Sequence, residues 1–178
     1  IEITPIVESS ASILNNPDPL RLGNIMARAR MMILFDIAAE ISALPLGTSN
    51  KTELLLGYGT LHGDLASAIN PLAPLYKRQV FILAEALGLP EDVIQKAPSA
   101  DLEPGQTDED DIGWTYELMD RVLYRATELS WSRDKLIAEG FDAESVNGIL
   151  DRSRNFSFKA NLPIKATLKS ALRANPND

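Results

Sequence analysis

Residues 44–53 read LPLGTSNKTE, and this stretch decides the fold class that the sequence predicts. Its first three residues indicate a short buried strand, although Pro45 has no N–H and would cost the strand one ladder hydrogen bond. Turn-forming residues follow from Gly47 to Asn50, and a helix is expected directly after them. Strand, loop and helix in this order are typical of an α/β domain, which is the fold class that we expect.

Helical periodicity flanks this stretch on both sides. Apolar residues recur at three-and-four spacing from Leu22 to Ile33, which predicts a helix that runs to about Ala43. Downstream, the same spacing predicts a helix over residues 76–87, which Gly88 ends. The side chains expected to face inward from this second helix are those of Val80, Leu83, Ala84 and Leu87.

The C-terminal half is predicted to be helical, so we expect a single domain, 1–178, with a helical subregion over 115–154. Ser132 is the expected N-cap of one helix, and Gly140 is the residue expected to stop it. The three predicted helices cover residues 115–129, 132–139 and 143–151.

The opening residues and the number of strands indicate a longer protein. Residues 1–6 alternate between apolar and polar side chains, which predicts a strand that Pro5 ends or places at a sheet edge. A sheet needs more than the two strands visible here, so the others are expected elsewhere. Because the chain also begins with Ile1 rather than Met, we expect N-terminal sequence to be missing.

A long loop separates the predicted helices. Residues 57–74 contain three glycines and two prolines and show no sustained period. Loops of this length inside a compact domain are usually functional or mobile. We therefore interpret residues 57–74 as a binding loop.

Composition excludes several classes of function. The 178 residues carry a net charge of -8, which argues against a nucleic-acid or anionic-membrane partner because these need clustered Lys and Arg. No apolar run is long enough for a membrane span. The absence of Cys excludes disulfides and thiolate chemistry and is compatible with the cytoplasm, where we expect the protein, and a single histidine, His62, excludes a histidine-rich metal site.

Ordered motifs along the chain resemble those of a known family. They read GNIMARARM (23–31), LGTSNKTE (46–53), GYGTLHGD (57–64), INPL (69–72), LYK (75–77), PSADL (98–102) and PGQTDEDDIG (104–113). In this order they resemble NAD synthetases of the ATP-pyrophosphatase superfamily, from Ile1 to about Leu123 and again near Lys159. The resemblance implies the C-terminal portion of an ammonia-dependent enzyme with a Rossmann-like three-layer α/β/α fold.

The resemblance also implies a reaction. ATP adenylates the nicotinate carboxylate of deamido-NAD, pyrophosphate leaves, and ammonia attacks the adenylate to give NAD. This chemistry needs Mg²⁺ and cationic side chains to neutralise polyphosphate charge, and it needs no protein nucleophile. Relatives form homodimers through a helix that resembles residues 21–43, and Met31 and Phe35 lie on the side of it opposite the main apolar stripe.

Four residues are expected on the ATP side of the site by this resemblance. Thr48, Lys77 and Ser99 match positions that contact ATP, and Glu53 matches a magnesium ligand. Taken alone, Lys77 stands in a first helical turn, where the helix dipole disfavours a cation unless an anion is near. A tolerated surface lysine is the alternative.

Glu53 and the acidic run at residues 108–111 also have plain structural interpretations. A helix cap formed by Ser49 or Asn50 together with Glu53 would account for the same residues. The acidic run follows Thr107 and could likewise cap a helix, whereas in relatives this loop orders over the active site.

Three residues match positions that contact deamido-NAD, namely Arg28, Asp64 and Lys159. Arg28 shares a helix face with Asn24, one turn earlier, and the alternative is an ordinary solvated face. His62 is expected to be an exposed or structural histidine without a catalytic role.

The chain also departs from the family pattern. Leu61 stands where many relatives carry Lys, Ala68 where they carry Asp, and Phe158 where they carry His. The pyrophosphate-binding motif Ser-Gly-Gly-x-Asp-Ser occurs nowhere in the sequence, so these residues alone are not expected to form the adenylate. The alternatives are a non-catalytic nucleotide-binding or dimerisation module and a ligase that amidates a different nucleotide.

Overall fold

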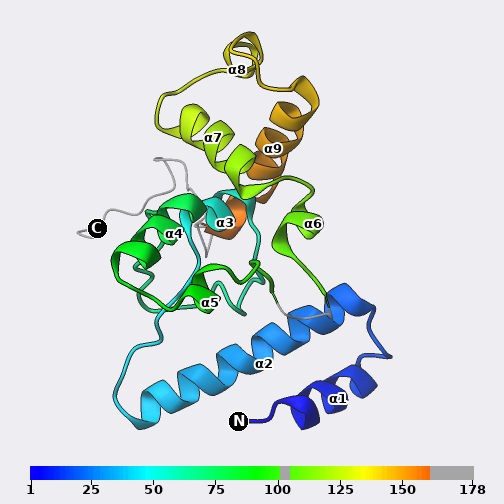
Figure 1. The fold of residues 1–178 in the computed structure, drawn as a ribbon. Helices are drawn as coiled ribbons and strands as arrows, with labels where there is room; N and C mark the ends of the chain where they lie inside the picture. Colours follow the sequence, from blue (N-terminus) through cyan, green and yellow to red (C-terminus); the bar gives the residue numbers. More distant parts are fainter. Residues whose placement is uncertain (101–104, 161–178) are drawn as a thin grey trace, which may run out of the picture.

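The computed structural model describes residues 1–100 and 105–160, and its ordered elements there are helices (Figure 1). No helix in these residues is both long and apolar enough to cross a membrane. The α-helices are α1 (Thr4–Ile13), α2 (Pro19–Glu40), α3 (Lys51–Leu56), α4 (Lys77–Ala86), α5 (Glu91–Ile94), α6 (Asp108–Ile112), α7 (Tyr116–Thr127), α8 (Arg133–Ala138) and α9 (Ala143–Phe156), followed by the 3-10 helix η1 (Ser157–Ala160). Asp101, Leu102, Pro104 and the tail from Asn161 lie outside the described residues.

The strand expected at residues 44–46 is not formed as a buried element. Leu44 and Leu46 are each 65% exposed, and Leu46 makes only an isolated parallel bridge with Ile69. The Pro45 carbonyl accepts the Ala68 N–H at 3.0 Å, so pairing begins, but Pro45 has no N–H with which to extend it. Within the described residues the fold is helix-rich, and the expected sheet is not visible.

The strand expected at residues 1–6 is also wrong, because Thr4 already begins α1. Pro5 lies in the first turn of this helix, where its missing N–H leaves no intrahelical bond unmade and its fixed φ suits the helix. Glu2 accepts hydrogen bonds from both the backbone N–H and the hydroxyl of Thr4. In Figure 1, α1 lies alongside α2, and the two helices are in contact.

The long helix predicted from Leu22 is confirmed as α2. Asp18 caps it by accepting the Arg21 N–H at 2.9 Å, and Pro19 occupies its first turn. Its buried positions are small residues, Gly23, Ala27, Ala29 and Ala38. Large apolar side chains on the same helix remain exposed: Met32, Leu34 and Phe35 at 52%, 60% and 40%.

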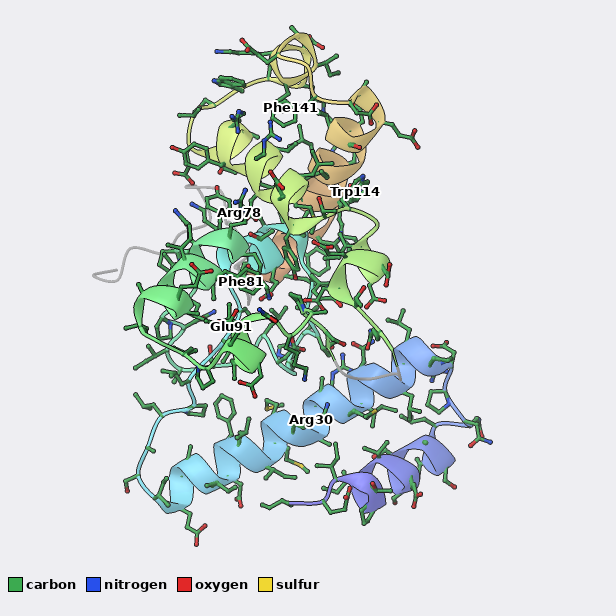
Figure 2. The ribbon with its side chains drawn as sticks, in the orientation of Figure 1. Arg30, Arg78, Phe81, Glu91, Trp114 and Phe141 are labelled. Atoms are coloured by element: carbon green, nitrogen blue, oxygen red, sulfur yellow. The ribbon has the colours of Figure 1, made fainter. Side chains whose placement is uncertain are left out.

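The core lies between α3, α7, α8 and α9, in the upper half of Figure 1. The predicted C-terminal helices are confirmed, with Ser132 capping α8 and Gly140 following it at φ 92°. Gly148 lets the Trp114 ring lie against α9, since a Cβ there would come within 2.4 Å of the ring (Figure 2). The fully buried side chains at the centre are Leu56, Met119, Val122, Leu123, Leu136, Val146 and Ile149.

The helix predicted over residues 76–87 is confirmed as α4, but its burial was predicted wrongly at two positions. Leu83 is 38% and Leu87 is 68% exposed. Val80 and Ala84 are half-buried and line a large pocket instead of entering the core. The apolar stripe of α4 therefore faces a cavity and solvent, a difference that periodicity cannot reveal.

Asp120 of α7 fixes the start of α4 from outside that helix. Its carboxylate accepts hydrogen bonds from the Arg78 N–H at 2.8 Å and from the Thr52 hydroxyl, whose oxygen accepts the Lys77 N–H at 3.0 Å. Thr52 is fully buried and Asp120 is 6% exposed. These two side chains satisfy the first N–H groups of α4, which otherwise lack intrahelical acceptors.

Replacing Asp120 by Ala is expected to lower the free energy of unfolding by about 3 kcal/mol, because the buried Thr52 hydroxyl and the partly buried Arg78 N–H both lose their acceptor. Urea unfolding measures the change. Asp151→Ala is the matched control, since that carboxylate pairs with Arg133 at the surface and its loss should matter much less. Equal effects of the two substitutions would contradict the proposed role of Asp120.

The stability of the protein should depend on pH through the same carboxyl. Burial raises the pKa of Asp120 above its ordinary value of 3.8, against the opposing hydrogen bonds from Thr52 and Arg78. The folded state then holds this proton more tightly than the unfolded chain, so the contribution to stability falls as pH rises above 3.8. We expect the difference in unfolding free energy, wild type minus Asp120→Asn, to decline across that range and then level off. An increase would show that the pKa is lowered.

Candidate active site

A large open pocket of about 1820 Å³ lies between α2 and the elements above it in Figure 1. Segments far apart in the sequence form its walls: α2, the residues before α3, the loop after α3, α4, α6 and α9. The expected site residues that line this pocket are Thr48, Glu53, Asp64, Lys77, Ser99 and Lys159.

Glu53 and Lys77 form a largely buried ion pair in this pocket. The Lys77 Nζ donates to Glu53 Oε1 at 2.9 Å, and the two side chains are only 16% and 14% exposed. Lys77 is the first residue of α4, so the anion that offsets the helix dipole at this position is the Glu53 carboxylate. The Lys77 ammonium also lies 4.9 Å from the centre of the Tyr116 ring.

The capping interpretation of Glu53 is confirmed as well. Asn50 accepts the Glu53 N–H, and Glu53 Oε2 accepts the Asn50 N–H, each at 3.0 Å, which is a complete capping box. One carboxylate oxygen thus caps α3 while the other faces Lys77. The two interpretations of Glu53 are compatible, because a carboxylate has two oxygens.

Two tyrosines contact the acidic helix α6, and one of them, Tyr116, also reaches the Glu53–Lys77 pair. The Tyr116 hydroxyl donates to Asp108 Oδ2 at 2.7 Å and lies 3.5 Å from Glu53 Oε1. The Tyr58 hydroxyl lies 3.0 Å from Asp108 Oδ1 and 2.8 Å from Asp111 Oδ2. Burial, together with the neighbouring carboxylates, raises the pKa of both tyrosines. Both therefore stay protonated donors, and Asp108, 4% exposed, is held from two sides.

The acidic run at residues 108–111 is confirmed as a helix start, because Thr107 caps α6 by accepting the Asp110 N–H at 3.2 Å. The acidic residues of this run have different contacts. Asp108 and Asp111 line the pocket, whereas Glu109 accepts the Tyr116 N–H at 2.7 Å. The run is both a cap and part of the pocket wall.

Lys159 fastens the predicted binding loop to η1. Its ammonium donates to the carbonyl oxygens of Gly57 and Gly59, each at 2.8 Å. Burial lowers the pKa of Lys159, as does the positive charge of Arg152, while Asp64 opposes them. Gly57 is left-handed at φ 59°, and a Cβ on it would come within 2.4 Å of the Phe156 Cβ.

The same loop is attached to α2 by Asn24 and Arg28, the two residues expected to share a face. The Thr60 hydroxyl donates to Asn24 Oδ1 at 2.8 Å, and Arg28 Nε donates to the Leu61 carbonyl at 3.1 Å. Arg28 does not line the large pocket but borders a smaller one beside α1. It is the one expected site residue that the structure does not bring together with the others.

Asp64 and His62 occupy the tip of the loop. Asp64 Oδ1 accepts the Thr60 N–H at 2.8 Å, which closes the loop on itself while the side chain stays exposed to the pocket. His62 is exposed, as expected, and lies at φ 58°.

The described residues contain no group of three or more His, Asp or Glu side chains arranged to hold a metal ion. Glu53, the expected magnesium ligand, could offer Oε1, which now accepts a hydrogen bond from the Lys77 ammonium. Mg²⁺ commonly binds one or two carboxylates together with substrate phosphates and waters rather than a protein cage. The donor set therefore suits an ion that arrives with a polyphosphate.

Sequence reasoning missed Arg152 of α9, which also lines the pocket. A signal was available: Val146 and Ile149 are fully buried on α9, and Arg152 continues their three-residue spacing toward Phe156. An arginine on an apolar stripe is unusual and marks a position to examine. Tyr58 and Tyr116 were missed because their partners lie about 50 residues away or on a separate helix.

Comparison with known proteins places these features in context. The family model for NAD synthase matches residues 1–163. The NH(3)-dependent NAD(+) synthetase of Trichlorobacter lovleyi is 49% identical over 166 residues, covering 93% of this chain and 61% of that protein. The enzyme of the same name from Chlorobaculum tepidum is 47% identical over 172 residues, covering 95% of this chain and 62% of that protein. The chain thus spans about three fifths of the length of these curated relatives.

Solved structures agree with the sequence comparison. The chain superimposes on the NMN synthetase from Francisella tularensis with a TM-score of 0.78 at 34% identity, over 94% of this chain and 66% of that one. For the NH3-dependent NAD synthetase from Campylobacter jejuni the TM-score is 0.74 at 34% identity, over 94% and 64%.

Proposed function

This chain belongs to the NAD synthase family, and we propose that the protein amidates deamido-NAD to NAD with ATP and ammonia through an adenylated intermediate. The observation that carries the proposal is the buried Glu53–Lys77 pair, which shares one pocket with Thr48, Asp64 and Lys159. It offers a cation for a triphosphate and a carboxylate for the accompanying ion, next to separate polar groups for a second nucleotide.

On the ATP side we propose that Thr48, Lys77 and Ser99 bind the triphosphate nucleotide. When ATP enters, Lys77 would turn from Glu53 toward phosphate oxygens, to which an ammonium binds as a point charge. Glu53 would then share Mg²⁺ with those phosphates, and the bound ion would neutralise polyphosphate charge. The cap on α3 survives this exchange because it uses the other oxygen of Glu53.

On the side of the deamidated substrate we propose Arg28, Asp64 and Lys159 as contacts. Lys159 and Arg28 each hold a backbone carbonyl of the loop at residues 57–64, so they can orient the loop as well as bind the substrate. Asp64 is the exposed carboxylate at the tip of this loop, where it can accept a hydrogen bond from the substrate or the incoming ammonia.

We further propose that the Leu46–Ile69 bridge belongs to the parallel sheet of a Rossmann-like three-layer α/β/α domain. The exposed apolar side chains of α2, including Met32, Leu34 and Phe35, support a second proposal, that this helix lies in a homodimer interface.

The test is an amidation assay of the full-length gene product with ATP, Mg²⁺, ammonium and deamido-NAD, followed by mass spectrometry. We expect NAD, AMP and pyrophosphate in equal amounts. Binding of both nucleotides without any turnover would instead support a non-catalytic module.

A second candidate substrate is the deamidated mononucleotide, nicotinic acid mononucleotide. Two observations favour testing it: a similar structure is that of an NMN synthetase, and Leu61 and Ala68 are apolar where the family resemblance implies charged substrate contacts. The ratio of kcat/KM for the two substrates decides between them. A ratio that favours the mononucleotide at least tenfold would replace NAD by NMN as the product.

A further inference from the structure

Arg152 sits on the buried face of α9, where an apolar side chain is expected. Val146 and Ile149 of the same stripe are fully buried, and Phe156 follows one turn after Arg152. Arg152 is half-buried, its Nε is buried, and the residue lines the wall of the large pocket. Burying part of a cation in this way is unfavourable unless something compensates its charge.

Within residues 1–100 and 105–160, Arg152 has no ion-pair or hydrogen-bond partner. Its Nε is buried and makes no hydrogen bond, and its guanidinium lies 5.5 Å from the centre of the Phe156 ring. Neighbouring arginines behave differently: Arg133 and Arg154 both pair with Asp151 at the surface. Within the part of the chain that the structure describes, the Arg152 Nε is therefore a buried donor without an acceptor.

The carboxylate that could serve as a partner is already engaged. Asp111 attracts Arg152 at a distance, but its Oδ2 accepts hydrogen bonds from Tyr58 at 2.8 Å and from Gln106 at 2.6 Å. Burial lowers the pKa of Arg152, which reflects an environment that does not fully compensate the charge. Asp111 Oδ2 is thus engaged by two other donors, and Arg152 makes no hydrogen bond to it.

A second cation shares this part of the pocket. The Lys159 ammonium lies 5.2 Å from the centre of the same Phe156 ring and is held in place by two loop carbonyls; burial, and after it the charge of Arg152, lowers the pKa of Lys159. An anion placed against both would offset the two positive charges and supply an acceptor for Arg152. The guanidinium fork suits the paired oxygens of a phosphate or carboxylate.

We infer that Arg152 is a substrate-binding residue whose guanidinium binds an anionic oxygen, phosphate or carboxylate, of the deamidated nucleotide. The inference rests on the proposed function and deepens it. The deamidated nucleotide is favoured over ATP because Arg152 and Lys159 lie against the same Phe156 ring, 5.5 and 5.2 Å from its centre, and Lys159 is a proposed contact of that nucleotide.

The test is calorimetric titration of the full-length protein with deamido-NAD and, separately, with ATP and Mg²⁺. Three variants are compared with the wild type: Arg152→Met, Arg152→Lys and the control Arg154→Met. Arg154 lies two residues further along α9, its side chain is 74% exposed, and it does not line the pocket. Thermal melting of each variant is recorded beside its binding constants.

We expect Arg152→Met to weaken deamido-NAD binding about 10- to 100-fold, the range of one charged hydrogen bond, and to change ATP binding less than twofold. Arg152→Lys should recover part of the affinity, and Arg154→Met should lose none. Melting of Arg152→Met should be unchanged or higher, because an unpaired buried charge is replaced by an apolar chain of similar length.

Three outcomes would overturn the inference, and they differ from one another. Tight deamido-NAD binding by Arg152→Met would show that the proposed function stands while Arg152 only packs on Phe156. A loss confined to ATP would assign Arg152 to the other nucleotide. Wild-type protein that binds no deamido-NAD would remove the proposed substrate together with the role of Arg152.

Discussion

Replacing Lys77 by Met should lower kcat/KM for ATP about a hundredfold, the scale on which single preorganised charge contacts act in catalysis. Lys77 is the cation of the pocket that begins a helix and already holds a carboxylate, so a phosphate can take the place of that carboxylate. The measurement is steady-state kinetics of the full-length protein at saturating ammonium and deamido-NAD.

Lys51 provides a closely matched control for this prediction. It too is the first residue of a helix, pairs with a glutamate, Glu128, and lies over a tyrosine ring, that of Tyr76 at 5.1 Å. It does not line the pocket. Lys51→Met should therefore change kcat/KM less than twofold. Equal losses in the two variants would mean that Lys77 acts through general stability rather than through ATP.

Glu53→Gln should also lower kcat/KM for ATP about a hundredfold and should raise the concentration of Mg²⁺ needed for half-maximal rate. The amide oxygen of Gln can still accept the Asn50 N–H, so the cap on α3 is preserved. The negative charge available to a metal ion and to Lys77 is lost.

Glu128→Gln makes the same chemical change outside the pocket, where Glu128 pairs with Lys51. Its kinetic effect should be less than twofold. A Glu53→Gln enzyme with normal kinetics and an unchanged Mg²⁺ requirement would reduce Glu53 to a helix cap.

Local signals in the sequence predicted most of the helices well. Ser132, Thr107 and Asn50 each cap the helix that follows, and such caps depend on residues three positions apart, so a single sequence reveals them. The opening segment was misread because Pro5 is compatible with an edge strand and with a first helical turn, and only the packing of α1 on α2 decides between them.

Burial was harder to predict than secondary structure. Leu83 and Leu87 continue a helical stripe, yet α4 has no buried residue, because its apolar side meets a cavity and solvent. The expected strand at residues 44–46 likewise forms only one bridge, since a strand needs partners that periodicity cannot supply.

In the candidate site, too, local features could be predicted from the sequence and contacts between distant residues could not. The family resemblance supplied Glu53 and Lys77, whose contact spans 24 residues, and no local rule would have paired them. Arg152 could have been noticed on the stripe of Val146 and Ile149, but its lack of a partner is visible only in three dimensions. Arg28, expected to contact deamido-NAD, lies outside the large pocket and donates to the Leu61 carbonyl of the loop, a placement that the sequence does not reveal.

The most direct measurement is a crystal structure of the full-length protein with a non-hydrolysable ATP analogue, Mg²⁺ and deamido-NAD. We predict the triphosphate within hydrogen-bonding distance of the Lys77 ammonium, the ion between the Glu53 carboxylate and the phosphates, and the deamidated nucleotide against Lys159. A triphosphate bound elsewhere, with the Glu53–Lys77 pair intact, would contradict this account.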